Sequence, residues 1–148
     1  MRCLPLAFTA LYLLLWPLFT TTTAHPTRAQ GVAVKGRLMC GSEPLIGAKV
    51  KTIDVDTGMD PDDLLAEGYT DAEGRFELRG FTREATDIDA VIKIYHDCDD
   101  GERPCQRKVL WEVPRKYHNS LSSVEQWFDV GTVNMEIKFR REERDCRH

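Results

Sequence analysis

The sequence predicts an all-β protein, an antiparallel β-sandwich of about seven strands. Three observations support this prediction. Short segments of alternating apolar and polar residues recur along the chain, turn-forming Gly, Pro and Asp residues separate them, and no long amphipathic helical pattern is present. Four cysteines after residue 24 further predict two disulfide bonds.

The first 24 residues differ in composition from the rest of the chain. Arg2 provides a positive charge, a leucine-rich apolar run follows, and small residues end at Ala24. This order is typical of a secretory signal peptide. An uncleaved membrane anchor is less favoured, because Pro17 interrupts a run already short for a bilayer span of about 20 residues. We therefore expect a signal peptide over 1–24, one domain over 25–148, and a secreted, extracellular protein that is not integral to a membrane.

The charge balance argues against binding to nucleic acid. The chain has 20 basic and 24 acidic residues and a net charge of −4. Only one basic residue and no acidic residue lies in the predicted signal peptide, so the remaining domain is slightly more acidic. A general nucleic-acid binder needs a basic face.

Cys40, Cys98, Cys105 and Cys146 remain after the signal peptide, and an even count in an oxidising compartment predicts that all four form disulfides. Four cysteines allow three pairings. We expect Cys98–Cys105, which closes a small loop, and Cys40–Cys146, which ties the C-terminal tail to the first strand. No Cys-x-x-Cys pair occurs, so a metal site or another cofactor is not predicted.

The first half of the domain begins with a disordered leader, His25–Gln30. Val32–Leu38 alternates with period two and predicts a strand with one face exposed to water. Gly41–Pro44 predicts a turn, because proline fixes φ and lacks an N–H donor. The next predicted strand is Ala48–Asp54, and the aspartate-rich segment Asp54–Asp63 predicts a loop.

The middle of the chain is predicted to form a hairpin followed by a strand. Extended structure is expected at Leu64–Thr70, a tight turn at Asp71–Gly74, and the return strand at Arg75–Arg79. Gly80–Asp87 is predicted to be a connection. The β-branched segment Ile88–His96 then predicts a half-buried strand.

The last third contains two more predicted strands. Arg107–Val113 is the first, and Pro114 ends it. Ser120–Gln126 has capping-box spacing and predicts one helical turn. Phe128–Phe139 is the final predicted strand, and Arg140–His148 is a charged tail.

Several short motifs are distributed along nearly all of the domain. They are Val34-Lys-Gly-Arg-Leu-Met-Cys40, Asp62-Asp-Leu-Leu-Ala-Glu-Gly68, Thr70-Asp-Ala-Glu-Gly-Arg-Phe-Glu-Leu78, Asp87-Ile-Asp89, Lys93-Ile-Tyr-His-Asp-Cys98, Cys105-Gln-Arg-Lys108, Phe128-Asp-Val-Gly131 and Glu143-Arg-Asp-Cys146. Together these motifs resemble the nematode transthyretin-like family. The resemblance implies a transthyretin (prealbumin)-like β-sandwich, similar in fold to the thyroid-hormone carrier and to hydroxyisourate hydrolase, with binding or adaptor roles that include recognition of cell surfaces. Departures from the family pattern occur at Glu112, 119–126 and 137–141.

Catalysis is not predicted. Hydroxyisourate hydrolase chemistry would need converging histidines and a Tyr-Arg-Gly-Ser ending, whereas this chain ends in Cys146-Arg-His148 and has no histidine in its first strand. His96, beside Asp97, fits a structural role better than that of a base. The Asp54–Asp63 loop could offer oxygens to calcium, but its spacing does not match an EF-hand, and a solvated loop is the simpler interpretation.

The candidate binding residues are one aromatic and a basic cluster. Trp127 could anchor an interface, although core packing is the more common role of a tryptophan. Lys138, Arg140 and Arg141 could contact an anionic lipid surface, although neighbouring acids balance them. We therefore predict an extracellular binding or adaptor protein that recognises a protein or cell-surface partner. The alternative is a carrier of a small hydrophobic ligand at a subunit interface.

Overall fold

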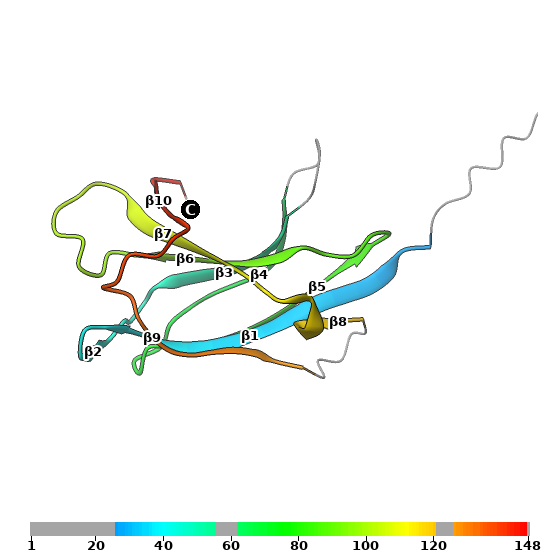
Figure 1. Ribbon diagram of the computed structural model, residues 1–148, viewed down its shortest axis with the longest axis horizontal. Helices are drawn as coiled ribbons and strands as arrows, with labels where there is room; N and C mark the ends of the chain where they lie inside the picture. The colour runs from blue at the N-terminus through cyan, green and yellow to red at the C-terminus, as the bar shows by residue number, and fades with distance from the viewer. Residues whose placement is uncertain (1–25, 56–61, 121–125, 148) are drawn as a thin grey trace, which may run out of the picture.

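The computed structural model describes residues 26–55, 62–120 and 126–147, which form two β-sheets packed as layers (Figure 1). The first sheet is built on the long strand β1 (Arg28–Cys40). β5 (Arg75–Glu84) pairs antiparallel with one edge of β1, and β9 (Phe128–Asn134) pairs parallel with the other. The two-residue strands β2 (Glu43–Pro44) and β8 (His118–Asn119) pair near the ends of β1.

The second sheet has the order β10-β7-β6-β3-β4, and all of its pairs are antiparallel. Within the described residues the only helical element is the 3-10 turn η1 (Arg115–Tyr117). The predicted all-β sandwich is confirmed, with one parallel pair that was not expected. The strands of this sheet are β3 (Lys49–Asp54), β4 (Asp63–Tyr69), β6 (Ala90–His96), β7 (Gln106–Glu112) and β10 (Glu142–Asp145).

Alternating residues of the two sheets meet in one core. β6 is a central strand and is buried over most of its length, as its β-branched sequence predicts. The largest fully buried apolar side chains come from both sheets and from the β5–β6 and β9–β10 connections. Removing them from water is the main driving force for the fold. They are Leu38, Ile88, Ile92, Ile94, Met135, Val32, Val34, Val50 and Val109.

The tight turn between β4 and β5 lies where the sequence predicts it. Gly74 has φ of +74°, and a Cβ atom there would collide with the carbonyl oxygen of Leu38. Asp71 Oδ1 accepts hydrogen bonds from the N–H groups of Glu73 and Arg75, at 3.0 and 2.7 Å. Local turn chemistry therefore fixes this hairpin.

Two predicted boundaries were wrong because β1 and β5 are longer than expected. Residues from Arg28 to Arg37 pair with Glu84 to Arg75 in continuous antiparallel register. Much of the expected leader and most of the expected 80–87 connection are therefore strand. Backbone pairing between the two segments compensates for their weak individual patterns.

The last predicted strand was also wrong in its second half. β9 ends at Asn134, whose side chain accepts hydrogen bonds from the N–H groups of Gly41 and Glu136. Met135 is fully buried but Ile137 is 55% exposed, so the alternation does not continue. The chain then crosses to the second sheet and forms β10, where only a charged tail was expected.

The expected disulfide pairing was wrong, although all four cysteines are bonded. Cys40 pairs with Cys98, and Cys105 pairs with Cys146, with Cα atoms 5.6 and 4.5 Å apart. The ends of β1 and β6 meet at one end of the sandwich, which brings the first two cysteines together. Because β10 pairs with β7, Cys146 lies next to the start of β7 rather than near β1.

Three predictions fall wholly or partly outside the described residues: the signal peptide, the helical turn predicted at Ser120–Gln126, of which 121–125 are not described, and the middle of the acidic loop over 56–61. In the part of the chain that the structure describes, no helix has the length and apolar character of a bilayer span.

Candidate functional site

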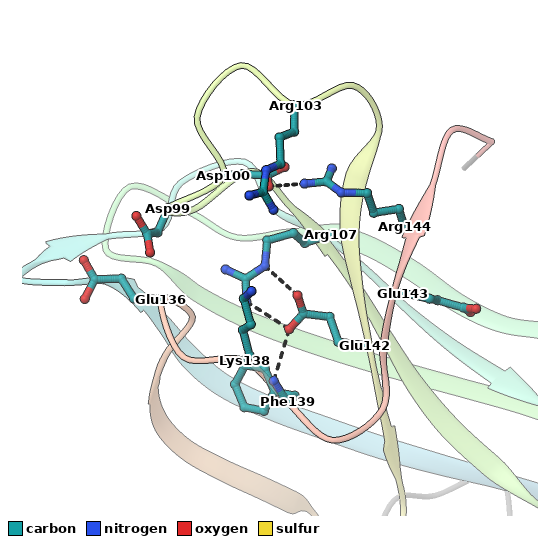
Figure 2. A pocket seen from close by; sticks show the side chains of 10 residues that line it. All are labelled: Asp99, Asp100, Arg103, Arg107, Glu136, Lys138, Phe139, Glu142, Glu143 and Arg144. Carbon is teal, nitrogen blue, oxygen red and sulfur yellow. Dashed lines mark hydrogen bonds and ion pairs between the residues drawn. The ribbon is translucent and has the colours of Figure 1, made fainter.

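A polar pocket of about 300 Å³ lies at the disulfide end of the sandwich (Figure 2). The β6–β7 loop, the β9–β10 connection and the strands β7 and β10 form its walls. Cys98, just after β6, and Cys105, just before β7, anchor the β6–β7 loop through the two disulfides. The residues that line the pocket are Asp99, Asp100, Arg103, Arg107, Glu136, Lys138, Phe139, Glu142, Glu143 and Arg144.

Arg107 forms the floor of the pocket and uses all five of its N–H donors inside the protein. Nε and one Nη2 donor bind the Glu142 carboxylate at 2.8 and 2.9 Å. The other three bind backbone carbonyls at 2.7, 2.8 and 2.7 Å, those of Cys98, Met135 and Ile137. A guanidinium has no sixth donor, so Arg107 has none left for a ligand. We call this arrangement the Arg107 clamp.

The clamp is electrostatically balanced. Hydrogen bonding to Arg107 lowers the pKa of Glu142, and the N–H of Phe139 donates to the same carboxylate at 3.1 Å. The bond to Glu142 likewise raises the pKa of Arg107. Both groups stay charged and paired near neutral pH, so the clamp fixes the β9–β10 connection against β7.

Asp100 is buried beside the clamp. One of its carboxylate oxygens pairs with the guanidinium of Arg144, and the other has no partner in the described residues. Nη1 of Arg144 donates to the carbonyls of Pro104 and Cys105 at 3.0 and 2.6 Å. In Figure 2 Arg144 and Asp100 meet at the top of the pocket, apart from the pair formed by Arg107 and Glu142.

His96 is buried at the end of β6 and is only 2% exposed. Its Nδ1 accepts a hydrogen bond from the N–H of Cys98 at 3.2 Å, which places the ring proton on Nε2. Burial, with a further effect from nearby Arg107, lowers the pKa of His96 to about 4. The ring is neutral at physiological pH and does not line the pocket, in agreement with the predicted structural role.

The predicted binding residues do not form one cluster. Lys138 lines the pocket, Arg140 is exposed nearby in the chain, and Arg141 pairs with Glu112 of β7. Trp127 lies over the first sheet, with Lys35 Nζ 5.7 Å and Arg79 Cζ 4.6 Å from its ring. The basic cluster is therefore divided, and Trp127 belongs to another surface.

The described residues contain no group of three or more His, Cys, Asp or Glu side chains arranged to hold a metal ion. At the two described ends of the acidic loop, Asp54 and Asp62 bind protein groups. Asp54 Oδ1 accepts from the N–H of Asp89 at 2.7 Å, and Asp62 pairs with Lys93 at 3.0 Å.

Sequence reasoning did not identify the Arg107 clamp. One signal was present: Arg107 is in phase with the core residue Val109 in β7, so its side chain had to point inward. A core-facing arginine needs a buried carboxylate or carbonyl partners. The partner Glu142 lies in Arg140–His148, where the sequence predicts only a charged tail.

Comparison with known proteins identifies the family. The sequence model of the transthyretin-like family matches residues 35–114. The chain is similar to three proteins of Caenorhabditis elegans. Transthyretin-like protein 33 is 52% identical over 80% of this chain and 83% of its own length. Transthyretin-like protein 46 is 48% identical over 91% of this chain and 75% of its own length. Transthyretin-like protein 5 is 43% identical over 80% of this chain and 86% of its own length.

These relatives match 80–91% of this chain, and none of their names states an enzymatic activity. The motifs that suggested the resemblance lie on the strands and turns of the fold described above. The chain belongs to the transthyretin-like family.

Proposed function

We propose that the protein is a secreted, non-enzymatic binding or adaptor protein whose partner docks at the disulfide end of the sandwich. The docking surface is the loop rim, which comprises Asp99, Arg103, Glu136, Ile137 and Lys138. All five residues are exposed. The observation that carries the proposal is the Arg107 clamp, because it holds the loops of this rim in place without using any rim side chain.

A rim held in this way loses little conformational freedom when it binds. The Cys40–Cys98 and Cys105–Cys146 disulfides fix the β6–β7 loop at both ends, and the clamp binds the carbonyls of Met135 and Ile137. Pre-organised loops avoid part of the ordering cost of association. The rim is therefore suited to a specific partner.

The chemistry of the rim favours a protein partner over a lipid surface. Arg103 and Lys138 supply positive charge, and Asp99 and Glu136 supply negative charge. An anionic membrane would be repelled by the two acids, whereas a protein can place complementary charges against all four. Ile137 adds an exposed apolar side chain that a protein pocket could bury.

Pairwise binding measurements on a panel of purified secreted and cell-surface domains would test the proposal. We expect R103E/K138E to weaken binding to the partner by about tenfold or more, since each lost interfacial charge pair weakens binding. The matched control R83E/K116E makes the same charge change on β5 and η1 and should leave binding unchanged. Loss of binding in the control, with full binding by R103E/K138E, would contradict the proposal.

The alternative function, transport of a small hydrophobic ligand, requires a subunit interface. Light scattering after size-exclusion chromatography separates the two hypotheses. A stable tetramer would favour the carrier, and a monomer would favour docking at the loop rim.

A further inference from the structure

The outer face of the first sheet carries two neighbouring rows of polar side chains with different charge balance. β1 lies between β5 and β9, so each outward-facing residue of β1 has one neighbour on either side. In the first row Lys35 lies between Glu77 and Asp129. In the second row Arg37 lies between Arg75 and Thr132.

The first row is neutralised by its own Lys35 and by Arg79 beside it. Lys35 Nζ is 3.9 Å from Asp129 Oδ2, and Glu77 pairs with Arg79 at 3.5 Å. Each cation in or beside this row therefore has a carboxylate within ion-pair distance. The row needs no ligand to balance its charge.

The second row has no such balance. Arg37 Nε donates to the backbone carbonyl of Glu73 at 2.8 Å, and no carboxylate forms an ion pair with Arg37 or Arg75 among the described residues. Two like charges directly opposite on antiparallel strands destabilise a sheet. The arrangement costs stability in the free protein, and a bound anion would remove that cost.

We propose that the row Arg75–Arg37–Thr132 binds the acidic group of a sugar, a carboxylate or a sulfate ester of an acidic glycan. Two guanidiniums can hold one oxyanion by charge-assisted, bidentate hydrogen bonds, and the Thr132 hydroxyl adds a third donor. The row opens into a groove of about 590 Å³, which Asp71, Glu77 and Asp129 also line. Asp71 already accepts two backbone N–H groups through Oδ1.

The carboxylates of this groove favour a sugar over other anionic partners. The hydroxyl groups of a sugar can donate hydrogen bonds to Glu77 and Asp129 while its acidic group meets the two arginines. A membrane would instead present many anionic headgroups to the same carboxylates. Among the described residues, the most exposed large apolar side chains do not line this groove; they are Ile46, Leu64, Tyr69 and Ile137.

This site is separate from the loop rim, and each can be tested without the other. Full-length oxidised protein would be measured against immobilised heparin, which carries sulfate, against hyaluronate, which carries carboxylate only, and against phosphatidylserine vesicles. We expect binding to at least one glycan and a loss of about tenfold or more in R37Q/R75Q, since each charge-assisted bond contributes on this scale. The control R83Q/K116Q removes the same charge from β5 and η1, outside the groove, and should retain most of the binding.

A melting-temperature measurement distinguishes loss of the binding site from misfolding of the variant. The glycan that binds should raise the melting temperature of the wild-type protein and leave that of R37Q/R75Q unchanged. The proposal is overturned if R37Q/R75Q binds the glycans as the wild type does, if the control loses equal affinity, or if the wild-type protein binds neither glycan, whether or not it binds vesicles. The choice between heparin and hyaluronate identifies the acidic group.

Discussion

The arginine of the polar pocket and the arginines of the first sheet are used in opposite ways. Arg107 is 4% exposed and directs all five donors to a carboxylate and three carbonyls of its own chain. Arg37 and Arg75 face each other at the surface and pair with no carboxylate of the described residues. A saturated, buried guanidinium holds structure together, whereas the half-buried Arg37 and the exposed Arg75 are available to bind an anion. Substitutions should separate these roles.

The largest effect is expected at the clamp. R107M should lower the free energy of unfolding by about 3–5 kcal/mol, because Glu142 would remain largely buried without its partner. Chemical denaturation measures this change. The double variant R107M/E142M should recover part of the loss, since no unpaired carboxylate is left behind. A loss below about 1 kcal/mol in R107M would show that the clamp is not a stabilising feature.

Disulfide removal should have the next largest effect. The linked cysteines are 58 and 41 residues apart, and loop entropy depends only weakly on loop length. C40S/C98S and C105S/C146S should therefore each cost about 2–4 kcal/mol. Peptide mapping of the oxidised protein should find the Cys40–Cys98 and Cys105–Cys146 links. Recovery of a Cys98–Cys105 peptide would contradict the structure.

His96 should make stability depend on pH. Its pKa is lowered on folding from 6.5 to about 4, so the unfolded chain binds the proton more readily between these values. The contribution of neutral His96 to the free energy of unfolding is therefore fully present above pH 6.5. It falls as the pH is lowered, by about 2–3 kcal/mol on approaching pH 4.5. Glu142, whose pKa is lowered, loses its contribution only below its ordinary pKa of 4.5.

The variant H96N isolates this effect, because the asparagine oxygen can replace Nδ1 as the acceptor for the N–H of Cys98. The free energy of unfolding of H96N, measured by denaturation at several pH values, should stay constant between pH 6.5 and 4.5. An unchanged slope in H96N would assign the pH dependence to another group.

The smallest effect is expected at the exposed arginines. R75Q should lower the free energy of unfolding by no more than about 0.5 kcal/mol, or should raise it, because the substitution removes a like-charge contact. Thermal melting at low salt, where this repulsion is least screened, would detect the gain. A clear destabilisation would show that Arg75 contributes to folding and would weaken the distinction from Arg107.

The parts of the fold that depend on local chemistry could be predicted from the sequence. The Asp71–Gly74 turn follows from a short-range side-chain cap and a glycine with positive φ, and the buried strand β6 follows from its β-branched run. Features that depend on pairing between segments far apart in the sequence could not be predicted from it. The disulfide pairing was missed because β10 was not recognised, and a four-residue strand of charged residues has no apolar pattern to reveal it.

The candidate sites show the same limit. Lys138, a predicted binding residue, lines the pocket, whereas Arg141 of the same predicted cluster pairs with Glu112 on β7. Arg37 and Arg75 each look like ordinary exposed positions of a strand. Only the register of β1 against β5 places them opposite each other, and no single segment encodes that register.

The pairing of β1 with β9 also constrains the order in which the chain can fold. β1 comes first in the domain, yet one of its edges pairs with the segment from Phe128 to Asn134, near the other terminus. Contacts between such distant segments slow folding, because a long loop must close before they form. During synthesis from the N-terminus, the first sheet therefore keeps an open edge until almost the whole chain has emerged.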